Sequence, residues 1–158
     1  MRRIFADELY RHAQEDSSIY LVTADLGYKV WDQWRDTLPL QFLNTGASEQ
    51  SALDICIGLA MAGKKPYFYS ITPFLIFRPF ESIRNYINHE KWNVKLIGSG
   101  RDNDYKHDGW SHNATDVRKF MDQFENIHQS YPETKEEIPS LVDVLVQSSD
   151  PWFISLKK

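Results

Sequence analysis

The strongest constraint on the fold is an apolar run over residues 51–62 with well-marked ends. The run is apolar on nearly every face, which is typical of a helix that is buried all round. Ser48 is a candidate N-cap, Gly63 stands where a left-handed C-cap is expected, and Pro66 prevents the helix from continuing. The sequence therefore predicts a buried helix with a carboxylate, Glu49, in its first turn. Taken alone, Glu49 could simply complement the helix dipole, an effect of about 0.3–1 kcal/mol.

Helical and strand patterns alternate along the rest of the chain, with short connections. They predict helices over 2–14, 74–88, 116–125 and 135–146, a loop with a short helix over 28–39, and strands at 19–23, 41–43, 67–71, 94–97, 127–130 and 152–156. This order predicts an α/β fold of one domain, residues 1–158, with a three-layer, mostly parallel six-stranded sheet and helices on both faces. In such sheets the functional side chains lie outside the carboxyl ends of the strands, which singles out loops 25–28, 44–49, 71–77 and 98–112.

Composition excludes several classes of protein. A formal charge of −4 and an isoelectric point near 5.7 argue against nucleic-acid binding, which needs a clustered basic face. Uninterrupted apolar segments all fall short of the roughly 20 residues that span a bilayer. A single cysteine, Cys56, leaves no internal disulfide and fits a reducing compartment. We therefore expect a cytoplasmic protein without nucleic-acid or membrane partners.

Three strings of residues together resemble a known family. The first runs from Asn44 to Gln50 (NTGASEQ) and is followed by Gly58, Gly63, Pro73-Phe74 and Arg78; the second is Asp108-Gly109-Trp110-Ser111-His112; the third is Tyr131-Pro132-Glu133-Thr134. In order and spacing they are similar to the pyrimidine-binding domain of transketolases and deoxyxylulose-phosphate synthases, over roughly residues 4–158. The resemblance implies a domain that binds the pyrimidine ring of thiamine diphosphate.

The resemblance also implies roles for cofactor-binding residues. Glu49 matches the glutamate that hydrogen-bonds the aminopyrimidine in a dry pocket and favours the tautomer that activates the cofactor. Phe74 and Phe77 match aromatic rings that pack on the pyrimidine, and Ile71 stands where transketolases often have another aromatic residue. Asp25 matches an aspartate near the thiazolium ring. Core packing for the two phenylalanines and a turn-forming role for Asp25 are the structural alternatives.

The substrate residues implied by the resemblance are His112, Asp108 and Lys29. His112 would hydrogen-bond or move protons to sugar hydroxyls and the carbonyl oxygen. The loop departs from the family, since Trp110 replaces a smaller residue and Gly100 stands near the place of an upstream histidine. The substrate is therefore expected to differ from the ordinary pentose phosphates.

The polar loop over residues 101–112 has two other interpretations, neither of which involves a sugar. It could be a solvated surface loop. A metal site could also be formed by Asp102, Asp104, His107 and His112, but their spacing matches no tight ligand motif. We therefore expect no metal ligands in this chain.

The motifs that hold the diphosphate and Mg²⁺ in this superfamily, Gly-Asp-Gly and a later Asn-Asn, are absent from the sequence. The resemblance therefore implies a stand-alone small subunit of a split transketolase-like enzyme. It would share thiamine diphosphate with a diphosphate-binding subunit that binds Mg²⁺. Such an assembly is expected to contain homodimer contacts and two small plus two large subunits.

Two alternative functions remain open from the sequence. One is a subunit of another thiamine diphosphate enzyme, such as the beta-type chain of a 2-oxo acid dehydrogenase or a decarboxylase or carboligase. The other is a non-catalytic remnant that acts as a binding partner. Retention of Glu49, Phe74 and His112 together argues against the remnant.

Overall fold

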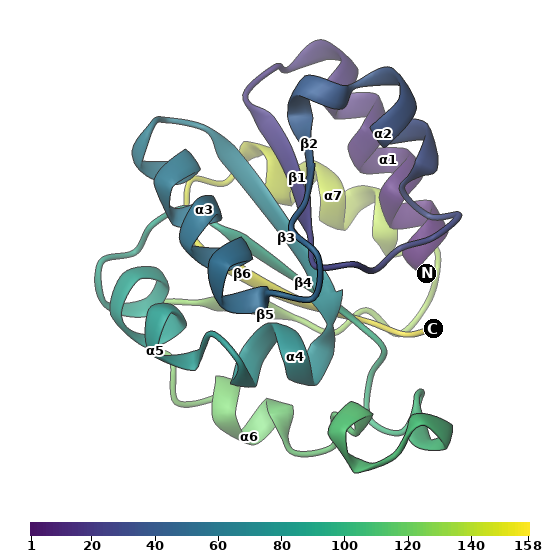
Figure 1. Ribbon diagram of the computed structural model, residues 1–158, viewed down its shortest axis with the longest axis vertical. Helices are drawn as coiled ribbons and strands as arrows, with labels where there is room; N and C mark the ends of the chain where they lie inside the picture. The colour runs from purple at the N-terminus through teal and green to yellow at the C-terminus, as the bar shows by residue number, and fades with distance from the viewer.

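The computed structural model describes residues 1–158 and is built around one six-stranded sheet (Figure 1). All five strand pairs are parallel, so the predicted α/β fold is confirmed. In spatial order the strands are β2 (Phe42–Asn44), β1 (Ile19–Thr23), β3 (Lys65–Ile71), β4 (Lys95–Ser99), β6 (Trp152–Leu156) and β5 (His128–Ser130).

Helices cover both faces of the sheet, as Figure 1 shows. The longer helices are α1 (Arg2–Glu15), α3 (Glu49–Met61) and α7 (Ile138–Gln147), and the shorter ones are α2 (Asp32–Thr37), α4 (Thr72–Phe77), α5 (Phe80–Ser82) and α6 (Val117–Met121). Four further helical segments are the 3-10 helices η1 (Pro39–Gln41), η3 (Lys106–Asp108) and η4 (Trp110–His112) and the π-helix η2 (Ile83–His89). Apolar residues of α1, α2 and α7 form the core on one face, and those of α3, α4, η2 and α6 form it on the other.

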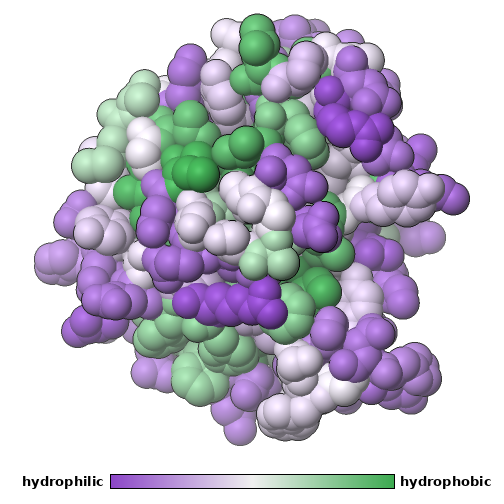
Figure 2. Space-filling view, viewed as in Figure 1, coloured by the Kyte–Doolittle hydropathy of each residue, from purple (hydrophilic) through white to green (hydrophobic).

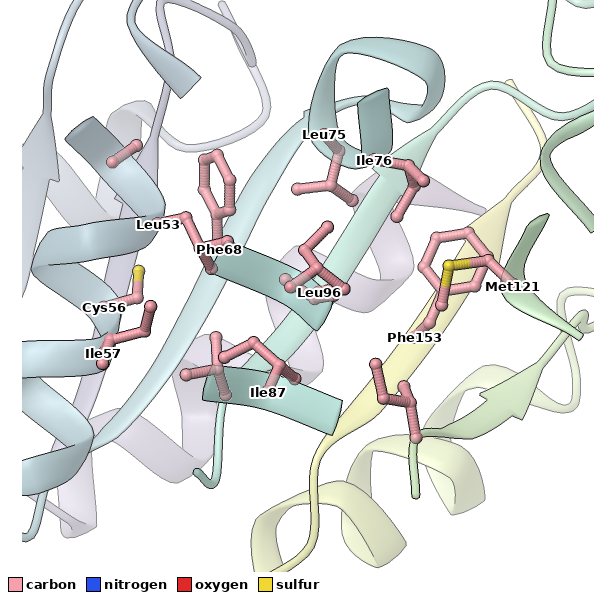
Figure 3. Close-up of a cluster of buried hydrophobic side chains, with 14 of the residues drawn as sticks. Leu53, Cys56, Ile57, Phe68, Leu75, Ile76, Ile87, Leu96, Met121 and Phe153 are labelled. Atoms are coloured by element: carbon pink, nitrogen blue, oxygen red, sulfur yellow. The ribbon is translucent and has the colours of Figure 1, made fainter. Parts of the chain in front are cut away.

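The core under α3 and α4 fixes both helices against the centre of the sheet (Figure 3). Leu53 of α3 and Leu75 of α4 are fully buried, and they belong to one cluster with Phe68 of β3 and Leu96 of β4. Burying a leucine or phenylalanine side chain stabilises a fold by about 1.5–3 kcal/mol. These contacts hold the N-terminal ends of α3 and α4 beside the carboxyl end of β3.

The ends of α3 follow the predicted signals with one difference. Ser48 is the N-cap residue, but its hydroxyl lies 3.0 Å from that of Ser51 instead of accepting a backbone N–H. At the other end Gly63 has a φ of +78°, and the N–H groups of Gly63 and Lys64 donate to Ala60 and Leu59. This arrangement is a Schellman motif, which satisfies carbonyl groups at the helix end.

The prediction that α3 is buried on every side is wrong for the single chain. The sheet covers the side that carries Leu53 and Cys56. Gln50, Asp54 and Gly58 lie on the exposed side, together with Ile55 (39% exposed) and Met61 (58% exposed). In Figure 2 apolar surface gathers over the part of the molecule where α3 lies in Figure 1.

The helix predicted over 74–88 is broken in the structure. Pro79 follows α4, and the chain continues through α5 and the π-helix η2. Proline cannot donate the backbone hydrogen bond that a continuous helix requires, which explains the break. The helices predicted over 116–125 and 135–146 are shorter or shifted, as α6 and α7, while α2 is the short helix expected within 28–39. No helix combines the length and hydropathy needed to cross a membrane.

Candidate functional site

Glu49 lies at the start of α3 with its carboxylate buried against β3. The residue is only 2% exposed. Ser70, near the end of β3, donates its hydroxyl to Oε1 at 3.0 Å, and Nη1 of Arg78 lies 2.5 Å from Oε2. A buried carboxylate is costly unless it is paired and hydrogen-bonded. Both oxygens of Glu49 have a partner, so the charge is compensated.

Phe74 of α4 connects this carboxylate to the polar loop. The guanidinium carbon of Arg78 lies 3.8 Å from the centroid of the Phe74 ring, which is a close cation–π contact. The imidazole of His112 meets the same ring edge-on, with 4.8 Å between centroids and an interplanar angle of 64°. The structure thus gathers Glu49, Phe74 and His112, three residues that the sequence predicts for the site.

The loop that carries His112 is held by Tyr105. The Tyr105 hydroxyl lies 2.9 Å from Nη1 of Arg2 and 2.9 Å from Oγ of Ser99, so the loop is tied to α1 and to the end of β4. The rings of Tyr105 and His112 are 6.5 Å apart. His112 is half-buried, and its Nδ1 lies 3.1 Å from the hydroxyl of Ser111. Position and orientation of the imidazole therefore depend on contacts within the chain.

The other predicted site residues lie at the same edge of the sheet but make different contacts. Asp108 is exposed on η3. Phe77 packs edge-on against Phe120 of α6, with 5.0 Å between centroids, and Ile71 is the half-buried residue before α4. Their proposed contacts with cofactor or substrate stay predictions.

Asp25 and Lys29 follow β1, and both have left-handed backbone angles, with φ of 48° and 62°. The backbone N–H of Asp25 donates to Oδ1 of Asn44 at 3.0 Å, which ties the ends of β1 and β2 together. Asp25 and Trp31 both line a cavity of about 230 Å³. The ammonium of Lys29 lies 5.3 Å from the centroid of the Tyr28 ring, on the exposed side of this loop. Their roles also stay predictions.

Three residues at the site were not among the predicted site residues: Arg78, Ser70 and Tyr105. Arg78 stands four positions after Phe74, a spacing that brings two side chains onto the same helical face, and this signal could have found it. Ser70 lies one position before the end of β3, in the region where parallel sheets place their ligands. Tyr105 carries no comparable sequence signal, because its contacts with Arg2 and Ser99 depend on the fold of the loop.

One acidic residue of the polar loop, Asp104, has structural partners. The carboxylate of Asp104 accepts backbone N–H groups of Arg101 and Lys158, each at 2.9 Å. No group of three or more His, Cys, Asp or Glu side chains is arranged to hold a metal ion.

Comparisons with known proteins agree with this geometry. The sequence model of the family described as "Transketolase, pyrimidine binding domain" matches residues 1–158. The chain is 28% identical over 154 residues to one of the subunits of the apulose-4-phosphate transketolase of Phocaeicola vulgatus, covering 97% of this chain and 49% of that protein. It is 23% identical over 159 residues to the putative transketolase C-terminal section of Methanocaldococcus jannaschii, covering 100% of this chain and 50% of that protein.

A solved structure is similar as well. The structure described as "Split gene transketolase, inactive beta4 tetramer" has a TM-score of 0.86 and 26% identity, over 99% of this chain and 50% of that one. The chain thus spans about half the length of the curated relatives that it matches. The match of the family model over residues 1–158 shows that the chain belongs to the transketolase pyrimidine-binding domain family.

Proposed function

We propose that this chain provides the pyrimidine-binding half of a split transketolase-like enzyme, which transfers a two-carbon ketol unit between sugar phosphates or related sugars. The observation that carries this proposal is the buried carboxylate of Glu49, which is fixed by Ser70 and linked to the Phe74 ring through Arg78. A carboxyl group and an aromatic face fit the two needs of an aminopyrimidine ring, which are an in-plane hydrogen bond and a stacking surface. The site thus fits the pyrimidine of thiamine diphosphate, on which this family depends.

Glu49 is the residue that acts on the cofactor in this proposal. When bound, thiamine diphosphate supplies a carbanion that can attack a carbonyl carbon. Glu49 hydrogen-bonds the pyrimidine nitrogen, and burial excludes the water that would otherwise compete for the carboxylate. Ser70 fixes Oε1, and Oε2, which pairs with Arg78 in this structure, is the oxygen that would meet the pyrimidine. Phe74, Phe77 and Ile71 give the pocket its apolar walls, and Asp25 lies toward the thiazolium.

His112 is the residue that acts on the sugar. Its ring contact with Phe74 supports this role, because an imidazole at the edge of the proposed pyrimidine site could exchange protons with the substrate oxygens. Asp108 and Lys29 contact the rest of the sugar in this proposal, and Trp110, two positions after Asp108, offers a side chain that is 78% exposed. The relative from Phocaeicola vulgatus belongs to a transketolase named for apulose 4-phosphate, which supports a less common sugar or sugar phosphate here.

The partner is a diphosphate-binding subunit that holds Mg²⁺ and shares the cofactor. This chain offers groups for the pyrimidine but no Gly-Asp-Gly and Asn-Asn motifs for the diphosphate and metal. The exposed side of α3 is the surface for assembly, since it carries Ile55 and Met61 and borders a cavity of about 480 Å³. The similar split-gene structure is a tetramer of its beta chains, which supports contacts between copies of this chain. We propose two small and two large subunits.

Reconstitution with a chain that carries the missing motifs tests this function. The mixture should transfer a ketol unit from a ketose donor to an aldehyde acceptor, and the reaction should require thiamine diphosphate and Mg²⁺. Glu49→Gln in the same complex is the matched inactive control. Oxidation or simple decarboxylation of a 2-oxo acid, without ketol transfer, would instead place the enzyme in another thiamine diphosphate class. A stable complex with bound cofactor and no turnover of any donor would support a binding role only.

A further inference from the structure

Arg78 makes two contacts at once with the proposed cofactor site. Its Nη1 lies 2.5 Å from Oε2 of Glu49, and its Cζ lies 3.8 Å from the centroid of the Phe74 ring. These are the two groups that the proposed function gives to the aminopyrimidine, one for its hydrogen bond and one for its face. The guanidinium of Arg78 therefore contacts both groups at once.

The guanidinium of Arg78 and the aminopyrimidine of the cofactor are both flat groups that can form the same two kinds of contact. A guanidinium is planar, donates hydrogen bonds in its plane to carboxylates, and stacks on aromatic rings. An aminopyrimidine is also planar and would meet the carboxyl in its plane and Phe74 with its face. Because the two groups would use the same carboxylate oxygen and the same ring face, they cannot both be bound there.

We propose that Arg78 occupies the place of the aminopyrimidine in the cofactor-free chain and leaves it when the cofactor binds. The inference rests on the proposed function and names a positioning residue for its central carboxylate. Arg78 keeps the carboxylate of Glu49 paired and oriented before the cofactor arrives. Without it, the carboxylate, 2% exposed, would retain only the Ser70 hydroxyl as a partner.

The surroundings of Arg78 allow it to leave. Its side chain is 45% exposed, and the bond to Glu49 is its only side-chain hydrogen bond. It stands at the C-terminal end of α4, directly before Pro79. Moving into water costs the guanidinium its bond to Glu49 and its contact with the Phe74 ring, and the bound cofactor then takes its place at both groups.

The experiment compares Arg78→Gln with Arg84→Gln in the complex with the diphosphate-binding subunit. Arg84 lies in η2, where its side chain bonds only Asn85, so the control removes the same charge away from the site. Calorimetry measures the Kd of thiamine diphosphate with Mg²⁺, and thermal melting measures the cofactor-free complex. Removing a competing closed state lowers the apparent Kd, because the apparent Kd equals the intrinsic Kd divided by the fraction of molecules in the open state. We expect Arg78→Gln to tighten binding roughly three- to tenfold and to lower the cofactor-free melting temperature, with Arg84→Gln changing neither.

Arg78→Lys keeps the test decisive if the glutamine variant does not fold. Lysine retains the positive charge for Glu49 but has no flat group to stack on Phe74, so it should also tighten binding, by a smaller factor. Unchanged or weaker cofactor binding by both variants would overturn the inference, since Arg78 would then stay beside the bound cofactor. A wild-type complex that binds no thiamine diphosphate would overturn the proposed function itself, a result that the variants cannot produce.

Discussion

The ring of Tyr105 lies directly over Gly100, where any side chain would collide with it. A Cβ at position 100 would stand 2.2 Å from Cε2 of Tyr105, and Gly100 also has a φ of +82°. The glycine is therefore required both by its backbone conformation and by the aromatic ring above it. This contact helps to hold the loop that carries His112.

Gly100→Ala should displace that loop while the sheet stays folded. Strained backbone at one residue costs on the order of 1–3 kcal/mol, and the collision with Tyr105 adds to it. We expect faster amide hydrogen exchange over residues 101–112 and reduced ketol transfer by the complex. Gly63→Ala is the matched control, because Gly63 has a φ of +78° and nothing within 4 Å of its Cβ position. Equal exchange in the loop of both variants would show that Tyr105 does not hold it through this contact.

Glu49→Gln should leave the fold nearly intact and slow cofactor activation by orders of magnitude. The amide keeps the shape and burial of the side chain but cannot serve as the acid that favours the active tautomer. Hydrogen–deuterium exchange at the thiazolium C2 in the assembled complex reports that step directly. Glu125→Gln, an exposed position, should exchange like the wild type. A wild-type exchange rate in Glu49→Gln would refute the role of Glu49.

His112→Ala should impair turnover but not cofactor affinity. Loss of one positioned acid–base or hydrogen-bonding group commonly costs about 10² to 10⁴ in rate. The substitution also removes the edge contact with Phe74, but the face of that ring remains available for stacking. His107→Ala, an exposed residue of the same loop, is the control. Weaker thiamine diphosphate binding with normal turnover would place His112 with the cofactor instead of the sugar.

The stability of the chain should fall in acid through Asp16. Burial by itself raises the pKa of Asp16, but hydrogen bonds from Ser18 and the ammonium of Lys65, 2.9 Å away, hold the pKa at about 2. Its unfolded value is about 4, so the contribution is complete above that pH and is lost as the pH falls toward 2. Urea unfolding between pH 2 and 5 should show a shallower pH dependence for Asp16→Asn than for the wild type or for Glu136→Gln. Identical slopes would contradict this linkage.

Sequence reasoning found the parallel sheet and its functional edge because apolar runs and breaks are local signals. The motifs name Glu49, Phe74 and His112 as candidate site residues, and the structure brings these three together through Phe74 and Arg78, while their roles stay predictions. The exposed face of α3 was missed because Ile55 and Met61 are as apolar as the residues that face the sheet. Which apolar side chains the sheet covers depends on tertiary packing, and composition alone does not record it.

Arg78 was missed as a site residue for a related reason. Its role depends on Pro79 ending α4, which leaves the side chain half exposed above Phe74 and within reach of Glu49, 29 positions earlier. Arg78 and Glu49 can pair over that separation because α3 and α4 both pack against β3. The sequence pattern predicts one helix over 74–88, in which Arg78 is an interior residue and not the residue that ends α4.

The isolated chain should self-associate and bind thiamine diphosphate poorly. It offers Glu49 and Phe74 to the pyrimidine, but the diphosphate and magnesium require the partner. The apolar residues on the exposed side of α3 favour association in water. Size-exclusion chromatography with light scattering, on the chain alone and with its partner, measures the first property, and calorimetry measures the second. Micromolar binding of the cofactor by a monomer would refute the split-enzyme proposal.

Gly58 gives a sharper test of the α3 surface. It lies within the helix on the exposed side and lines the cavity of about 480 Å³, and a Cβ there would meet no atom within 4 Å. Glycine within a helix is about 0.5–1 kcal/mol less stable than alanine, so the chain alone gains nothing from it. Close approach of another subunit would explain the missing side chain. Gly58→Ala should therefore stabilise the isolated chain by about that amount, whereas Gly58→Gln should keep the fold and weaken assembly, measured by light scattering. Wild-type assembly by Gly58→Gln would show that the subunits meet elsewhere.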